Sequence, residues 1–267
     1  MRKVAAAKHN SRGYNYGFGS GYCRGYCCVV WQAASWSCLL LIDIRRRALV
    51  NIPFKGLLFD LDGTLVDSIP AVTRAWSQWA QVKGLDPEHV MSVIHGRPAM
   101  ESISELLGNA SKAEVVREFQ WLEDFESTDT KGTKALPGSV ALLNALNEKQ
   151  VPWAIVTSGT LPVANARIKA AGLPLPKILI TPEKLTNGKP HPEPYLTGAR
   201  ELGLIAGQCI CFEDTQAGLL AAKSAKAVAI GILSHASKEE LPAADHHIRS
   251  MAELALDISP TKMVLKL

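Results

Sequence analysis

The sequence predicts an α/β protein whose parallel sheet carries an inserted helical segment. From residue 54 onward, short continuous apolar runs alternate with amphipathic helical patterns, and this alternation is typical of a parallel sheet covered on both faces. The apolar runs lie at residues 55–60, 153–157, 177–180, 208–213 and 227–230. Residues 69–134 contain no strand-like run and show helical periods at 71–82, 98–107 and 113–125. We therefore expect one sheet domain with an all-helical insertion after its first strand.

Length and composition exclude several classes of protein. The 267 residues suit one large domain or two small ones, and 47% hydrophobic with 20% charged residues is typical of a soluble globular protein. The formal net charge is +4, but eight of the 29 Lys and Arg residues and only one of the 25 Asp and Glu residues lie in 1–53. The rest of the chain is mildly acidic. Because nucleic-acid binding requires a basic patch on the folded domain, we expect no nucleic-acid partner.

The first 53 residues differ in composition from the rest and are interpreted as an anomalous extension. Residues 14–28 are rich in Gly, Tyr and Cys and show no helical or strand period. The apolar stretch 29–44 is shorter than the roughly 18 residues of a membrane span, and basic residues follow it instead of preceding it as in a signal peptide. We expect no membrane partner, and we hypothesise that translation starts at Val50 from a non-AUG codon. Recovery of a native peptide containing residues 14–24 by mass spectrometry would contradict this start.

Two of the six cysteines, Cys209 and Cys211, alternate within the apolar run 208–213. This position favours buried thiols over a disulfide framework, which is typical of a cytosolic protein. We therefore expect a cytoplasmic location.

A pair of carboxylates marks the end of the first strand. Asp60 ends the run, Asp62 follows two residues later, and Gly63 lets the chain turn away. Ligands of open parallel sheets bind outside the carboxyl ends of the strands. Two carboxylates this close repel each other unless a cation or a shared proton compensates, which favours Mg²⁺ and its oxygen ligands. A pair of solvated loop acids is the alternative explanation.

Three further polar groups lie near the ends of later strands. Thr157 and Ser158 end the run that begins at residue 153, and each alone is an ordinary helix cap. Lys189 lies between Gly and Pro in a turn before a helix, and a lone surface lysine is normally solvated. Glu213 and Asp214 follow an apolar strand, where adjacent acids are costly unless they meet a cation. Together with Asp60 and Asp62, these groups predict one site.

These motifs stand in the order found in the haloacid dehalogenase superfamily, which the chain resembles from residue 54 to about 254. The supporting segments are FDLDGTLVDS at 59–68, VTSG at 156–159, NGKPHPEPY at 187–195 and FEDTQAG at 212–218. The resemblance implies a Rossmann-like parallel-sheet core at 54–68 and 135–257, an α-helical cap at 69–134, the extension 1–53 and a C-terminal tail at 258–267. Within the superfamily, the chain is most similar to bacterial sugar-phosphate phosphatases of the hexitol and 2-deoxyglucose-6-phosphate type.

The resemblance also implies a role for each site residue. Asp60 would be the nucleophile that forms an aspartyl-phosphate, and Asp62 the general acid and then the general base. Lys189 would neutralise Asp60 and the transferring group, while Thr157 and Ser158 would hold phosphoryl oxygens. The implied Mg²⁺ ligands are Asp60, Asp62 through its backbone carbonyl, and Asp214, with Glu213 in support.

The helical insertion would close over the site and select the substrate. His95, Gly96 and Arg97 form a turn between two cap helices, and Arg97 would bind a sugar hydroxyl or a second anion or else lie on the surface. A solvated helix face is preferred for Glu123, and an ordinary loop histidine for His191. Three tryptophans at helical spacing are interpreted as the cap core, namely Trp76, Trp79 and Trp121.

The function expected is Mg²⁺-dependent hydrolysis of phosphomonoesters of small sugars or polyols by a monomeric enzyme. A phosphomutase of the same family is the alternative, in which the phosphoryl group returns to a sugar instead of to water. A catalytically inactive regulatory binding protein is a second alternative, which would predict loss of at least one core residue. None of Asp60, Asp62, Lys189 and Asp214 is missing.

Overall fold

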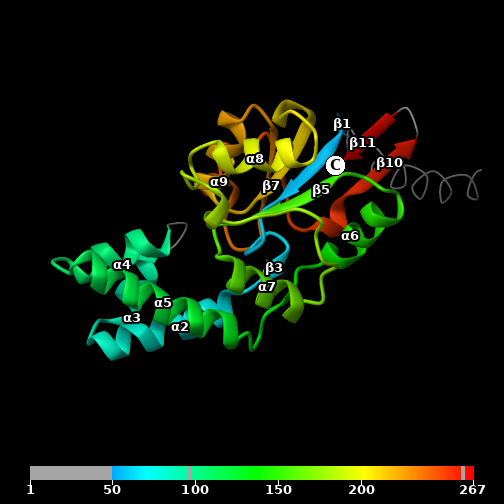
Figure 1. Ribbon diagram of the computed structural model, residues 1–267. Helices are drawn as coiled ribbons and strands as arrows, with labels where there is room; N and C mark the ends of the chain where they lie inside the picture. The colour runs from blue at the N-terminus through cyan, green and yellow to red at the C-terminus, as the bar shows by residue number, and fades with distance from the viewer. Residues whose placement is uncertain (1–49, 95–97, 260–261) are drawn as a thin grey trace, which may run out of the picture. The chain divides into compact units, whose positions relative to one another are not determined.

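A computed structural model describes residues 50–94, 98–259 and 262–267 of the chain. It contains a six-stranded parallel sheet in the order β6-β5-β2-β7-β8-β9 (Figure 1). The strands are β2 (Gly56–Phe59), β5 (Trp153–Val156), β6 (Leu179–Ile180), β7 (Cys209–Glu213), β8 (Val228–Ile232) and β9 (His246–Ile248). The predicted parallel α/β sheet is confirmed, and β9 is a strand that the sequence pattern did not indicate.

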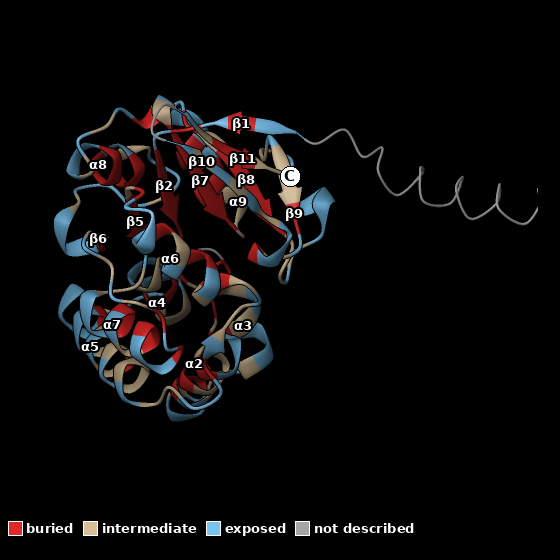
Figure 2. Cartoon of the chain, turned by 90° about the vertical axis from the view of Figure 1, so that its right-hand side faces the viewer, coloured by how far each residue is buried: buried red, intermediate tan, exposed pale blue. Residues whose placement is uncertain are grey.

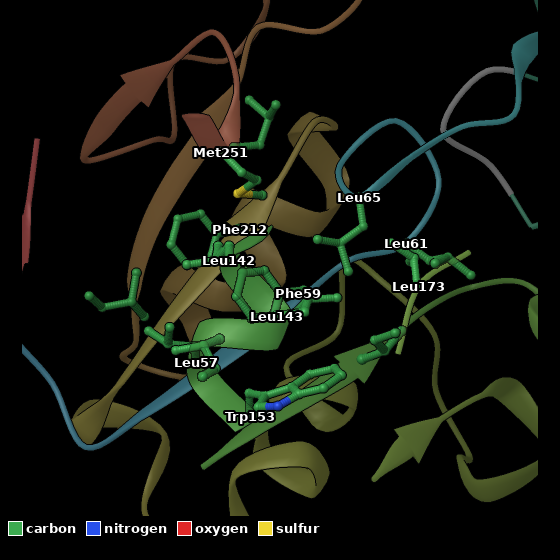
Figure 3. Close-up of a cluster of buried hydrophobic side chains, with 14 of the residues drawn as sticks. Leu57, Phe59, Leu61, Leu65, Leu142, Leu143, Trp153, Leu173, Phe212 and Met251 are labelled. Carbon is green, nitrogen blue, oxygen red and sulfur yellow. The ribbon is translucent and has the colours of Figure 1, made fainter. Parts of the chain in front are cut away.

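The central strands are buried on both faces, which explains their continuous apolar runs. Leu57 and Phe59 of β2 point into one hydrophobic cluster, part of which Figure 3 shows, whereas Leu58 between them belongs to the cluster on the opposite face. Phe59 stacks on Phe212 of the neighbouring strand with ring centroids 4.9 Å apart. The expected buried thiols at residues 209 and 211 are confirmed as free cysteines.

Helices cover each face of the sheet. They are α6 (Ser139–Glu148), α7 (Leu161–Ala170), α8 (Glu193–Glu201) and α9 (Gln216–Ser224). Leu143 of α6 and Ile168 of α7 belong to the cluster with Leu57, while Ala199 of α8 and Leu219 of α9 belong to the cluster with Leu58. Figure 2 shows the buried strands enclosed by helices whose outer sides are exposed. In the part of the chain that the structure describes, short 3₁₀ helices lie at Pro182–Lys184, Ala206–Gln208, Lys238–Glu240 and Met251–Glu253.

The helical insertion leaves and rejoins the core through a short antiparallel ribbon. In this ribbon β3 (Val66–Asp67) pairs with β4 (Lys134–Ala135). The helices between them are α2 (Ile69–Lys83), α3 (Pro87–Ile94), α4 (Ala99–Leu107) and α5 (Lys112–Thr128), grouped together in Figure 1. They form a hydrophobic cluster of their own. Among the described residues, no helix combines the length and the apolar character that crossing a bilayer requires.

The cap tryptophans agree only partly with their predicted role. Trp79 is fully buried and Trp76 is 4% exposed, and their rings meet edge to face with centroids 5.6 Å apart. Trp121 is half-buried and stacks on Phe125. We call the segment from α2 to α5 the cap.

Both ends of the described chain differ from the expected extension and tail. β1 (Asn51–Pro53), β10 (Ala255–Ser259) and β11 (Lys262–Lys266) form an antiparallel sheet in the order β1-β11-β10. Ile52, Val264 and Leu265 are buried in it. Pairing gives these short strands the backbone hydrogen bonds that they cannot make alone. Residues 50–53 therefore belong to the folded body, and the rest of the predicted extension lies outside the described residues.

Candidate active site

Three of the predicted site residues meet where the strand order reverses, namely Asp60, Thr157 and Asp214. β2 comes first along the chain among the strands of this sheet and lies between β5 and β7. The chain continues from β2 to β5 and β6 on one side, and then to β7, β8 and β9 on the other side. Asp60 follows β2, Thr157 follows β5, and Asp214 follows β7. All three line one cavity of about 720 Å³, whose wall also includes residues of the cap.

Three carboxylates and one ammonium group form the centre of this site. Oxygens of Asp60, Glu213 and Asp214 all lie within 4.8 Å of one another. Nζ of Lys189 lies 2.6 Å from Oδ1 of Asp60 and 2.5 Å from Oε1 of Glu213, and it donates to the carbonyl oxygen of Val156 at 3.0 Å. Two of the three carboxylates therefore contact the same ammonium group.

The raised pKa values of two of the clustered carboxyl groups indicate that a bound cation would stabilise their ionised forms. Burial, together with Glu213, raises the pKa of Asp214 to about 8. Burial also raises the pKa of Asp60 well above its usual value, although Lys189 opposes this rise. Burial lowers the pKa of Lys189, but the Asp60 and Glu213 carboxylates outweigh that effect and leave this pKa above its ordinary value. Mg²⁺ prefers such oxygen ligands and would compensate their charge, so the donor set fits this ion.

Glu213 is held on both oxygens by residues of neighbouring helices. Oε1 accepts a hydrogen bond of 2.6 Å from the hydroxyl of Tyr195 on α8, and Oε2 accepts one of 3.0 Å from Oγ1 of Thr215. Thr215 also caps α9, since its Oγ1 accepts from the amide of Gly218. A side chain at position 218 would overlap the Glu213 carboxylate. These engagements fit Glu213 as a support of the acidic cluster.

The turn after Asp62 brings the chain against Asp214. Gly63 has a φ of +80°, which favours glycine, and a Cβ there would overlap the Asp214 carboxylate. Oγ1 of Thr64 donates to Oδ1 of Asp214 at 3.4 Å, and the hydroxyl of Ser234 donates to the Gly63 carbonyl at 2.6 Å. Gly63 thus turns the chain, as the sequence predicts, and also leaves room for an acid from another strand.

The side chain of Asp62 is not one of the three grouped carboxylates and pairs with an arginine. Nη1 of Arg167 lies 2.7 Å from Oδ2 of Asp62, and Nη2 of Arg167 donates to Oε2 of Glu126 at 3.1 Å. Sequence reasoning missed Arg167 and Glu126. A signal for Arg167 exists, because it shares one helical face with the buried residues Val163, Ala164 and Ile168. A lone arginine on a core-facing stripe indicates a buried partner.

Other predicted residues have mixed positions. Thr157 is buried and its Oγ1 accepts from the amide of Gly159 at 3.0 Å, while Ser158 is exposed at the cavity rim. Glu123 is half-buried and lines the cavity, against the preference for a solvated face. His191 is exposed and its Nδ1 accepts from the amide of Glu193 in its own loop. His95, Gly96 and Arg97 lie outside the described residues.

Comparison with known proteins shows the family of this chain. Residues 54–226 match the family model described as haloacid dehalogenase-like hydrolase. The chain is 46% identical to hexitol phosphatase A of Escherichia coli K12 over 79% of this chain and 98% of that protein. It is 32% identical to 2-deoxyglucose-6-phosphate phosphatase 1 of Saccharomyces cerevisiae over 69% of this chain and 82% of that protein. A solved hydrolase from Pseudomonas syringae aligns with a TM-score of 0.67 and 27% identity, covering 75% and 95% of the two chains. With its motifs, its fold and these relatives in agreement, the chain belongs to the haloacid dehalogenase-like hydrolases.

Proposed function

We propose that this protein is a Mg²⁺-dependent phosphatase that hydrolyses phosphomonoesters of small sugars or polyols through a phosphoaspartate at Asp60. The observation that carries the proposal is the shared cluster of Asp60, Glu213, Asp214 and Lys189 at the base of a cavity under the cap. The cluster provides a nucleophilic carboxylate, oxygen ligands for a divalent cation and a fixed positive charge. Phosphoryl transfer depends mostly on such positioning and charge stabilisation.

Two displacements with balanced proton transfers complete the reaction. A carboxylate oxygen of Asp60 forms a bond to phosphorus as the ester P–O bond breaks, and Asp62 gives its proton to the leaving alcohol oxygen. Water then attacks the phosphorus, Asp62 takes a proton from this water, and the bond between phosphorus and Asp60 breaks. Bound Mg²⁺ would be held by Asp60 and Asp214 and would stabilise negative charge on the phosphoryl oxygens.

The cavity wall supports a small substrate with both apolar and hydroxylated faces. The cap contributes mainly apolar side chains, namely Val72, Trp76, Met91, Ile94, Phe119 and Leu122. Thr73 and Glu123 add polar groups to the same wall. A few placed polar groups among apolar side chains are typical of small-molecule sites, and the C–H face of a sugar or polyol suits the Trp76 ring. The names of the two phosphatase relatives favour the same class of substrate.

The first test follows phosphorus in the wild type and in Asp60→Asn. The protein is incubated with Mg²⁺ and a panel of hexitol and hexose phosphates, and free phosphate is measured. We expect phosphate release and an acid-quenched phosphoenzyme in the wild type, and neither in Asp60→Asn. Hydrolysis by Asp60→Asn at near wild-type rate would show that the nucleophile is wrong. Transfer of the phosphoryl group between sugar positions, without free phosphate, would identify a mutase.

A further inference from the structure

A single buried guanidinium joins the core of the protein to its cap. Arg167 is on the core helix α7, and its side chain is 5% exposed. Its Nη1 lies 2.7 Å from Oδ2 of Asp62, while its Nη2 lies 3.1 Å from Oε2 of Glu126. Glu126 lies in the last turn of the cap helix α5. The same side chain therefore contacts the proposed acid–base residue and a carboxylate that belongs to the cap.

The geometry of arginine suits this double contact. A guanidinium is planar and carries its donors in a fixed fork, so the position of one carboxylate constrains that of the other. Lysine offers a point charge on a flexible stem and does not impose this constraint. Burial lowers the pKa of Arg167, but Asp62 and Glu126 outweigh that effect, so Arg167 stays charged between its two partners.

The contact leaves one oxygen of Asp62 without a hydrogen-bond partner in the part of the chain that the structure describes. Arg167 engages Oδ2, whereas Oδ1 is buried and has no hydrogen-bond partner among the described residues. Oδ2 can accept the guanidinium hydrogen bond whether the carboxyl group is charged or neutral. The transferred proton can therefore reside on Oδ1 without loss of the contact to Arg167.

We propose that Arg167 is a positioning residue through which docking of the cap controls the acid–base function of Asp62. With α5 in place, Glu126 fixes the guanidinium, and the guanidinium fixes the orientation of the Asp62 carboxyl group. Movement of α5 away from α7 breaks the contact between Glu126 and Arg167, and Asp62 then loses its fixed orientation. The inference rests on the proposed function, because it requires Asp62 to act as acid and base.

The test compares two leaving groups. p-Nitrophenolate departs without protonation, whereas the alcohol of a hexitol phosphate needs a proton, and kcat/KM reports on formation of the phosphoenzyme in both cases. We expect Arg167→Lys to lower kcat/KM for a hexitol phosphate by about tenfold or more and to lower it far less for p-nitrophenyl phosphate. Arg200→Lys, an exposed arginine on α8, is the matched control and should change neither value.

A second pair of variants tests the dependence on the cap. Glu126→Gln should produce the same selective loss, and Asp124→Asn, an exposed acid on the same helix, should not. Because residues 126 and 167 act through one contact, the double variant Glu126→Gln/Arg167→Lys should lose no more than Arg167→Lys alone.

The outcomes separate failure of the role proposed for Arg167 from failure of the acid–base role proposed for Asp62. Equal losses for both substrates in Arg167→Lys make Arg167 a merely structural residue and overturn the inference, as does a multiplicative loss in the double variant. If Arg167→Lys does not fold, the test uses Glu126→Gln. Equal losses of kcat/KM for both substrates in Glu126→Gln then overturn the inference. Asp62→Asn is measured in parallel. If Asp62→Asn lowers kcat/KM equally for both substrates, the acid assigned under the proposed function is wrong. If Asp62→Asn shows the selective loss but Arg167→Lys and Glu126→Gln do not, only the role of Arg167 is overturned.

Discussion

Nζ of Lys189 lies 2.6 Å from Oδ1 of Asp60, and the two side chains are 6% and 10% exposed. The same ammonium group also contacts Glu213. Burial raises the pKa of Asp60, and the charge of Lys189 opposes that rise. A nucleophilic carboxylate must be ionised to attack phosphorus. Under the proposed function, the lysine would therefore contribute both to the stability of the site and to the reactivity of Asp60 through one contact.

Replacement of this lysine should damage activity and stability together. Lys189→Met leaves buried carboxylates unpaired, so we expect kcat to fall by at least about a hundredfold. Removing one partner of a buried pair should also lower the free energy of unfolding by about 3–5 kcal/mol in the metal-free protein. Steady-state kinetics and denaturant unfolding measure these effects. Lys169→Met, an exposed lysine on α7, serves as control. Unchanged kcat in Lys189→Met would contradict the assignment.

The raised pKa of Asp214 predicts how the stability of the metal-free protein depends on pH. Its pKa is about 8 in the folded protein, above the ordinary aspartate value of about 3.9 expected when unfolded. Between these values the folded state binds more protons than the unfolded state, so stability falls as pH rises toward 8. Mg²⁺ binds the ionised form and should reduce this loss. Thermal unfolding from pH 5 to 8.5, with EDTA or with Mg²⁺, measures both effects.

Asp214→Asn provides the control for the pH experiment. The amide does not titrate, so the pH slope of the metal-free variant should be smaller than that of the wild type, and Mg²⁺ should have less effect on it. Identical slopes for the wild type and Asp214→Asn would show that this carboxyl group is ionised normally in the folded protein.

Gly218 should not tolerate a side chain. Alanine favours a helix over glycine by about 1 kcal/mol, but here its Cβ would overlap the buried Glu213 carboxylate. Overpacking costs about 1–3 kcal/mol, so we expect Gly218→Ala to lower both the free energy of unfolding and kcat. Gly207→Ala is the matched control, because the nearest atom to a Cβ there is the Lys226 carbonyl oxygen at 3.4 Å. A Gly218→Ala protein as active and stable as the control would contradict the packing argument.

The hydroxyl of Tyr195 should matter through Glu213. Tyr195→Phe removes a buried hydrogen bond of 2.6 Å to Oε1 and keeps the ring, which lies 5.4 Å from the Lys189 ammonium. Hydrogen bonds to charged groups contribute about 1.5–3 kcal/mol, so the free energy of unfolding should fall by an amount of this order. We also expect weaker Mg²⁺ binding, measured by titration of phosphatase activity with the metal. An unchanged Mg²⁺ requirement would show that Glu213 keeps its position without this hydroxyl.

The elements predicted well from sequence are those whose environment is uniform along the chain. β2, β5 and β7 are buried on both faces, so their apolar runs are continuous and their acidic or hydroxyl ends are visible as motifs. β10 has the opposite character, because exposed and half-buried residues alternate along it and it contains Asp257. Its pairing with β11 comes from the chain folding back, which local composition does not encode.

The site was predictable where each residue follows its own strand, as for Asp60 and Asp214. The contact of Arg167 with Glu126 joins residues 41 positions apart on helices of the core and the cap. Each residue viewed alone resembles an ordinary helix charge. Their partnership depends on how α5 packs on α7, which a motif search within one element does not address.

The β3–β4 ribbon places Asp67 and Lys134 side by side, so the cap enters and leaves the core at nearly the same point. A segment whose two ends are adjacent can vary in length, or be exchanged for another, without altering the order of the sheet strands. The proposed catalytic residues on the sheet and the proposed substrate-selecting surface of the cap are therefore free to diverge at different rates. A chimera that carries a relative's residues between these two strands would exchange substrate preference as a unit and keep the chemistry of Asp60.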